Sequence, residues 1–308
     1  MRKKIFLVCA GLGLFFGLNV RTSGAVPSER HWESVSLRNY RVLFQKPQRH
    51  LAEKVAQVAW KITPKYQSIF GEVPRDTIRI LLANSRKEFD RLTRNTIPEW
   101  SQGVTRPDIH LIILMSNQIK EDRFFAVERH ELVHAWMGAL YPGVQTPRWF
   151  DEGMAVLLSG ERVSDNNTIL SRAVLTHSLL SLDDVNNVLR FGRAKARLAY
   201  AESYAALKFF VDYFGWKKFP PFFRQLKKTG SFDRALQSIT GLTIFQYEDN
   251  FEDYVKKHYH WQFLFDIDLY LWLALPLFVA VSFYFIRRKN RKRMNNWVDI
   301  SEEEHGGN

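Results

Sequence analysis

The chain has almost no cysteine: Cys9 is the only one among its 308 residues. Because Cys9 lies in an N-terminal segment typical of a cleaved secretory signal, the mature chain would contain no thiol. This excludes a disulfide framework and any metal site built from thiolates. A chain of this length does not need disulfides, since it can bury a sizeable hydrophobic core. Internal repeats and low-complexity tracts are also lacking, which excludes a repeat architecture.

No nucleic-acid-binding motif is present, so we expect no DNA or RNA partner. The formal net charge is nevertheless +12. Ten Lys/Arg and six Asp/Glu lie outside residues 26–262, which leaves +8 on that central region. A basic surface there could attract anionic lipid headgroups or an anionic envelope polymer. A charged surface that serves only solubility is the alternative, and the sequence does not decide between the two.

The N-terminus has the three parts of a signal peptide. Residues 2–4 are basic, Ile5 to Val20 is apolar and uncharged, and Ser23 and Ala25 supply small residues two apart. This pattern predicts a signal peptide over residues 1–25, cleaved after Ala25. An uncleaved N-terminal anchor is the alternative interpretation.

A second apolar stretch lies near the C-terminus. Leu269 to Ile286 contains 18 residues without a charge, and six positive charges follow between Arg287 and Arg293. The length is within the range that spans a bilayer, and the basic block marks the cytoplasmic side. We therefore predict a membrane span over residues 263–286 and a basic cytoplasmic tail over 287–308. A buried helix of a soluble protein is the alternative, but it leaves the six charges unexplained.

The two terminal segments agree with each other. A signal that exports the chain and a helix that stops transfer place residues 26–262 outside the cytoplasmic membrane. We expect a single-pass protein of the cell membrane with its C-terminus in the cytoplasm. Export without disulfides and a short basic tail suit a bacterium.

The central region predicts an α+β fold, with a mixed first half and a helical second half. Period-two patterns predict strands, and 3.6-residue patterns predict helices. We expect strands at Tyr40–Gln45, Thr77–Ala83 and Ile109–Met115. We expect helices at 49–70, from Ser85, from Glu121, and near 168–180, 199–214, 217–228, 231–239 and 244–258.

Several residues mark where these helices begin and end. Ser85 and Glu88 have the spacing of a capping box. Pro64 would kink or end the helix that contains it. Gly215 and Gly230 are plausible terminators for the helices that precede them.

The segment "HELVH" (His130–His134) places two histidines four residues apart on one helix face. Neutral imidazoles are good zinc ligands. Glu131 lies beside the first histidine, where its carboxylate can reach a water molecule on the metal. Zinc lowers the pKa of such a water towards about 7. Glu131 can then accept the proton and later pass it to the leaving amine.

A catalytic zinc ion usually has a third protein ligand, and Glu152 is the candidate. Seventeen residues separate it from His134, which suits a loop and a returning helix. Pro147 would break the chain, and Asp151 could cap a helix that starts at Glu152. The alternative is a solvent-facing histidine pair with an unrelated surface acid.

"HELVH" followed by "WFDEGMA" resembles the gluzincin branch of zinc metallopeptidases, the peptidase MA group. The resemblance implies that His130, His134 and Glu152 bind Zn²⁺ and that Glu131 is the general base. It also implies a zincin-like domain, with a small mixed sheet, an active-site helix and a helical C-terminal part. "YAESYAALKFFVDYFG" is similar to the helix whose tyrosine stabilises the oxyanion in gluzincin aminopeptidases, and Tyr200 is the matching position.

The sequence also departs from the gluzincin aminopeptidases. The gap before Glu152 is one residue shorter, and the segment that binds a substrate's free amine has no counterpart. Trp100–Thr105 stands where an edge strand would line the cleft, and it contains no acid. An endopeptidase is therefore favoured.

Four further residues have two interpretations. Tyr200 could stabilise the oxyanion, or it could belong to an apolar helix stripe with Tyr204 and Leu207. His177 and Asp183 or Asp184 could support the metal ligands or could lie on the surface.

Taken together, the residues predict an exported, membrane-anchored zinc metallopeptidase that acts on a peptide or protein substrate. One alternative is a non-hydrolytic zinc-binding or envelope-assembly module on the same fold. The other is a membrane-associated structural protein without a metal.

Overall fold

The computed structural model describes residues 32–95, 97–98, 101–117, 120–160, 163–185, 191–259 and 274–291. The predicted signal peptide lies outside the described residues, as do residues 263–273 of the predicted span and 292–308 of the predicted tail. The chain divides into two compact units, Met1–Tyr259 and His260–Asn308.

In the second unit the described residues form one helix over 274–291. Its apolar side chains are exposed, with Leu277 at 67% and Phe278 at 70%. Within the described ranges, no helix combines the length and the apolar character needed to cross a membrane. The span over 263–286 therefore stays a prediction.

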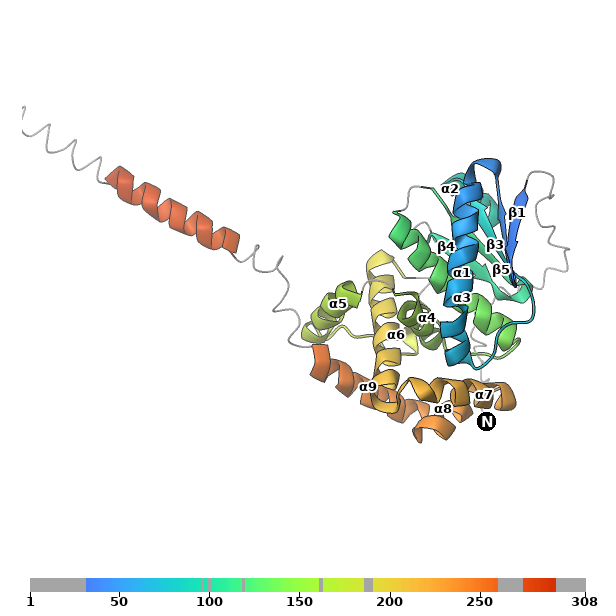
Figure 1. Ribbon diagram of the computed structural model, residues 1–308. Coiled ribbons are helices and arrows are strands. Elements are labelled where there is room, and N and C mark those ends of the chain that lie inside the picture. The colour runs from blue at the N-terminus through green and yellow to red at the C-terminus, as the bar shows by residue number, and fades with distance from the viewer. Residues whose placement is uncertain are drawn as a thin grey trace, which may run out of the picture. The chain divides into compact units, whose positions relative to one another are not determined.

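The first unit is built on a mixed five-stranded sheet (Figure 1). Its strands are β1 (Glu33–Leu37), β2 (Tyr40–Phe44), β3 (Ile78–Ala83), β4 (Gly103–Arg106) and β5 (Leu111–Met115). They lie in the order β1-β2-β3-β5-β4. The three inner strands are parallel, while β1 and β4 pair antiparallel with their neighbours. β4 is thus an edge strand whose outer side is not paired within the described sheet.

Helices cover both faces of this sheet. α1 (Arg49–Phe70) and α3 (Glu121–Leu140) pack on one face, and α2 (Arg86–Leu92) packs on the other (Figure 1). Residues along each strand contribute alternately to the cores on the two faces of the sheet, since successive side chains point to opposite faces. Residues that share the main core with α1 and α3 include Val42, Ile80 and Ile112. Residues that share the smaller core with Phe89 of α2 include Leu43, Leu81 and Ile113.

The remaining helices of this unit form the second half of the fold. They are α4 (Arg148–Ser159), α5 (Val163–Leu175), α6 (Arg193–Phe214), α7 (Phe219–Thr229), α8 (Phe232–Thr240) and α9 (Ile244–Tyr259). Aromatic side chains fill the space between α4, α7, α8 and α9, including Trp149, Phe150, Phe222, Phe232 and Tyr247. Each buried aromatic of this kind contributes roughly 1.5–3 kcal/mol to folding. This packing gives α4 a rigid support.

The predicted α+β organisation and most of the predicted elements are present, but several boundaries differ. β5 begins at Leu111 instead of Ile109, because Pro107–Ile109 is a 3-10 turn and His110 has a left-handed backbone (φ 50°). The predicted 168–180 helix spans Val163–Leu175, and the predicted 199–214 helix begins at Arg193. α4 begins at Arg148, so the prediction that Asp151 caps a helix starting at Glu152 is wrong. Pro147 at the N-cap starts the helix one turn earlier, which leaves Asp151 in the first helical turn.

Pro64 neither ends α1 nor prevents its last turn. The helix continues to Phe70 and stops at Gly71, whose φ of 84° closes it. A proline inside a helix costs about 3 kcal/mol. Burial of Tyr66, Ile69 and Phe70 after the proline outweighs that cost, because each adds roughly 1.5–3 kcal/mol.

The cap of α2 differs from a complete capping box. The Ser85 hydroxyl accepts a hydrogen bond from the Glu88 N–H at 3.2 Å, as predicted. The Glu88 carboxylate, however, accepts from the N–H of Asn84 at 2.8 Å. Both side chains still satisfy backbone donors at the start of the helix.

Candidate metal centre

α3 carries the two histidines and is held closely against the sheet. The Trp136 indole N–H donates to the Tyr40 hydroxyl on β2 at 3.1 Å. On the opposite side, a Cβ at Gly138 would lie 2.2 Å from Pro107 Cβ, and a Cβ at Gly103 would lie 2.8 Å from Glu131 Cγ. Only glycine permits such close approach. The edge strand β4 therefore lies directly beside the face of α3 that carries Glu131.

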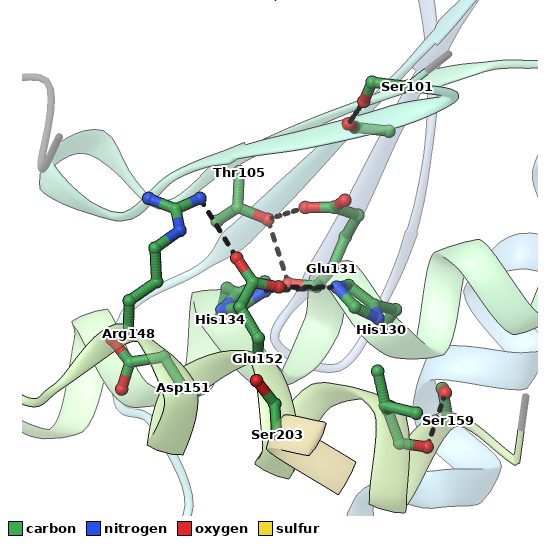
Figure 2. A network of polar contacts seen from close by, with 12 residues as sticks. Ser101, Thr105, His130, Glu131, His134, Arg148, Asp151, Glu152, Ser159 and Ser203 are labelled. Atoms are coloured by element: carbon green, nitrogen blue, oxygen red, sulfur yellow. Dashed lines mark hydrogen bonds and ion pairs between the residues drawn. The ribbon is translucent and has the colours of Figure 1, made fainter. Parts of the chain in front are cut away.

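The structure brings His130, His134 and Glu152 together, as Figure 2 shows. The two histidine Nε2 atoms are 3.3 Å apart. Glu152 Oε2 lies 3.4 Å from His130 Nε2 and 3.6 Å from His134 Nε2. Ligand atoms held tetrahedrally about 2.0–2.1 Å from a zinc ion are themselves about 3.3–3.4 Å apart. The three atoms therefore have the spacing of one face of a tetrahedral zinc site, so the residues fit such an ion.

Glu152 reaches the histidines because α4 packs very closely on α6. A Cβ at Gly153 would lie 2.4 Å from the Ser203 carbonyl oxygen and 2.4 Å from Leu207 Cδ2. The missing side chain lets the two helices approach at this level. Glu152, the preceding residue, is buried with its side chain 7% exposed. The helix crossing thus fixes the distance between the carboxylate and α3.

The charge of Glu152 is balanced within the site. Burial raises the pKa of Glu152, but the Arg148 guanidinium and the two imidazoles lower it more, so the net pKa is well below its ordinary value. Arg148 Nη2 donates to Glu152 Oε1 at 3.0 Å. Glu152 is therefore an ionised carboxylate at neutral pH. The neighbouring Asp151 accepts from the Thr146 hydroxyl, and burial raises the pKa of Asp151 to about 7.

Glu131 lies next to the three-residue cluster and is held by the edge strand. The Thr105 hydroxyl on β4 lies 2.7 Å from Glu131 Oε2 and 3.0 Å from the Glu131 carbonyl oxygen (Figure 2). The hydroxyl has one proton, so it donates to one of these acceptors at a time. Glu131 is 8% exposed as a residue, and Figure 2 shows its side chain near the cluster, where a general base would be needed.

Tyr200 also lies close to the cluster. Its ring centroid is 6.4 Å from that of His130, and the side chain is only partly buried. Tyr204 and Leu207, one and two turns further along α6, are buried. The apolar stripe expected for this helix is therefore present, but Tyr200 stands at its end, with its ring beside that of His130.

The other three sequence candidates are not part of the cluster. His177, Asp183 and Asp184 are exposed and do not belong to the group of possible metal ligands formed by the described residues. His177 has a left-handed backbone (φ 50°) in the turn after α5. Their exposure favours the surface interpretation.

Sequence reasoning missed Arg148 and Thr105. Arg148 is four residues before Glu152 on the same helix, and this spacing alone indicates that the two side chains can meet. Thr105 is 26 residues before Glu131 on another element, and no local pattern connects them. Its role depends on the pairing of β4 with β5.

Comparison with known families agrees with this geometry. The family model of the peptidase MA superfamily matches residues 65–257, which contain the three cluster residues, Glu131 and Tyr200. The chain therefore belongs to the peptidase MA superfamily. Membership suggests a metallopeptidase, and the His130–His134–Glu152 cluster could hold its metal. No curated protein matches the chain.

Proposed function

We propose that the protein is a zinc-dependent endopeptidase that uses Glu131 as its general base. The observation that carries this proposal is the triangle of His130 Nε2, His134 Nε2 and Glu152 Oε2, with sides of 3.3–3.6 Å and the Glu131 carboxylate beside it. Superfamily membership supports the same reaction class.

The donor set favours zinc over harder cations. Two imidazoles and one carboxylate form a common catalytic zinc site, whereas calcium and magnesium prefer oxygen ligands. When bound, zinc supplies Lewis acidity to a water molecule and to the scissile carbonyl. His130, His134 and Glu152 would hold the ion.

Glu131 would move the proton. Its carboxylate would accept a proton from the attacking water and return it to the leaving amine nitrogen as the peptide bond breaks. The Thr105 hydroxyl, 2.7 Å from Oε2, would hold the carboxylate in a fixed orientation. Tyr200 would donate its phenolic O–H to the carbonyl oxygen as negative charge develops there.

The edge strand supports an endopeptidase. β4 has an unpaired outer side among the described strands, so an extended peptide could add to the sheet there. Its sequence, Gly-Val-Thr-Arg, contains no acid that could bind a substrate's free amine. The strand is tied to the general base through Thr105, which contacts Glu131. An internal segment of a polypeptide therefore fits this edge better than a free N-terminus.

We also propose that the enzyme is anchored by a C-terminal span over residues 263–286, with its peptidase domain outside the cytoplasmic membrane. Support comes from the 18 uncharged residues of 269–286, the basic block after them and the N-terminal export pattern. Membrane fractionation of the full chain and of a chain truncated after Tyr259 tests the anchor. An equal distribution of both proteins would contradict it.

The reaction is tested with Glu131→Gln in the full chain. We expect one zinc per chain in both proteins by elemental analysis, and a loss of about 10²–10⁴-fold in hydrolysis of an unfolded protein substrate. Zinc far below one per chain in the wild type would contradict the metal site. If the Glu131→Gln variant lost hydrolysis but kept its full function in the cell, the non-hydrolytic envelope-assembly module would be favoured instead.

A further inference from the structure

The two oxygens of the Glu152 carboxylate have different partners. Oε2 faces the imidazoles, at 3.4 Å from His130 Nε2 and 3.6 Å from His134 Nε2. Oε1 points the other way and accepts from Arg148 Nη2 at 3.0 Å (Figure 2). The Glu152 side chain is 7% exposed and that of Arg148 is 24% exposed, so this ion pair is shielded from water.

This division matters because a carboxylate can bind a metal through one oxygen or through both. A catalytic zinc site has three protein ligands and keeps a further position open for water or substrate. If Glu152 turned so that both oxygens bound, it would occupy coordination space that the reaction needs. A guanidinium hydrogen bond to Oε1 opposes that rotation, and charge-assisted hydrogen bonds are about twice as strong as neutral ones.

The placement of Arg148 is unfavourable for the ion itself. A positive guanidinium close to a divalent cation is repelled by it, and this repulsion is strong in a site of low dielectric constant. Stability of the ion alone would therefore favour an uncharged residue at this position. Arg148 is on the same helix as Glu152, one turn earlier, which keeps the two groups in a constant relative position.

We infer that Arg148 is a positioning residue that makes Glu152 bind the metal through Oε2 alone and so keeps one coordination position open. This inference rests on the proposed zinc site. Arg148 would not touch the metal or the substrate and would act through the Glu152 carboxylate.

The test uses the full chain with its metal replaced by cobalt(II), whose visible absorption is strong in four-coordinate sites and weaker in five-coordinate ones. We compare wild type, Arg148→Met and Arg148→Lys. Arg148→Met should shift the spectrum towards that of a five-coordinate site, with weaker visible absorption, and should not weaken cobalt binding, because the variant removes the repulsion between the guanidinium and the ion. Arg148→Lys should show a smaller change, because lysine keeps the charge but not the planar fork of donors.

Arg129→Met is the matched control. Arg129 lies on α3 and contacts α4, since its Nε donates to the Ser159 carbonyl oxygen at 2.6 Å, but it has no hydrogen bond to Glu152 among the described contacts. We expect its spectrum and cobalt affinity to equal those of the wild type. Circular dichroism of each metal-free protein establishes whether it is folded. If Arg148→Met does not fold, the cobalt spectrum of Arg148→Lys tests the inference instead.

The outcomes separate the inference from the proposed function. A wild type that binds no cobalt overturns the zinc site and the inference together. A wild type that binds cobalt, with wild-type spectra in both Arg148 variants, overturns the inference alone. Equal changes in Arg129→Met and Arg148→Met would show that the effect does not depend on the hydrogen bond to Glu152, which also overturns the inference.

Discussion

The crossing of α4 and α6 at Gly153 should control the metal site, and Gly153→Ala tests this directly. The added Cβ would lie 2.4 Å from the Ser203 carbonyl oxygen, whereas ordinary contacts begin near 3.4 Å. The obstacle is backbone, so no side-chain rotation relieves it, and the helices must separate by about 1 Å. Overpacking of this kind costs about 1–3 kcal/mol, and the higher helix propensity of alanine returns up to about 1 kcal/mol. We expect a net loss of roughly 1–2 kcal/mol in the free energy of unfolding.

The functional effect should exceed what this loss of stability explains. A displacement of about 1 Å moves Glu152 relative to His130 and His134, and misplacement by that amount can cost about 100-fold in rate. Gly160→Ala is the matched control. Gly160 ends the same helix with φ at 73° and has nothing within 4 Å of an added Cβ, so alanine there is strained by about 1–2 kcal/mol without moving Glu152. Urea unfolding measures stability, and equilibrium zinc binding and kcat/KM measure the site. Equal zinc affinity in the two variants would refute the reasoning.

Three further predictions concern single side chains. Thr105→Val removes the hydroxyl 2.7 Å from Glu131 Oε2 and should lower kcat/KM by about 10–100-fold with zinc content unchanged. Thr105→Ser keeps a hydroxyl and should retain most activity, so equal rates in the two variants would contradict a role for the hydroxyl. Tyr200→Phe keeps the ring beside His130 but removes the hydroxyl that would stabilise the oxyanion, so kcat should fall by about 10²–10³-fold at constant zinc content. A wild-type kcat in this variant would leave Tyr200 only a packing role. Burial raises the pKa of Glu202 from 4.5 to about 8. Between about pH 4.5 and pH 8 the folded protein therefore keeps a proton on Glu202 that the unfolded chain loses. Protonation of Glu202 therefore contributes fully to the free energy of unfolding below about pH 4.5, and this contribution falls by about 1.4 kcal/mol per pH unit up to about pH 8. Glu202→Gln should flatten the pH dependence measured by urea unfolding between pH 5 and 8. Burial of Glu128 raises its pKa in the same direction, so the difference between wild type and variant isolates Glu202, and identical slopes would contradict the prediction.

Local patterns were sufficient for the parts of the site that lie close together in the sequence. The spacing of His130 and His134 places both on one face of any α-helix, because residues four apart are neighbours on its surface. The helix over Glu121–Leu140, the terminators Gly215 and Gly230 and the helical second half follow from patterns within one element. Glu152 was found through its spacing from His134 and through the resemblance of its segment to a family motif.

The remaining features depend on contacts between distant parts of the chain. The first strand, Glu33–Leu37, has no strong apolar alternation and becomes a strand by pairing with β2. Thr105 reaches Glu131 only because β4 pairs with β5 at the edge of the sheet. The need for glycine at positions 103, 138 and 153 can be recognised only in the folded structure, where an added Cβ would collide with a neighbouring backbone or side chain.

The sequence by itself therefore determined which side chains can bind a metal and supply a base, since those properties depend on residue type and spacing along one helix. Only the tertiary structure decided that the three ligand atoms lie 3.3–3.6 Å apart and that the Glu152 oxygens face different partners. Those distances are set by how closely α4 packs on α6 and β4 on α3. Such packing depends on side-chain volumes from many elements at once, and no short stretch of sequence contains that information.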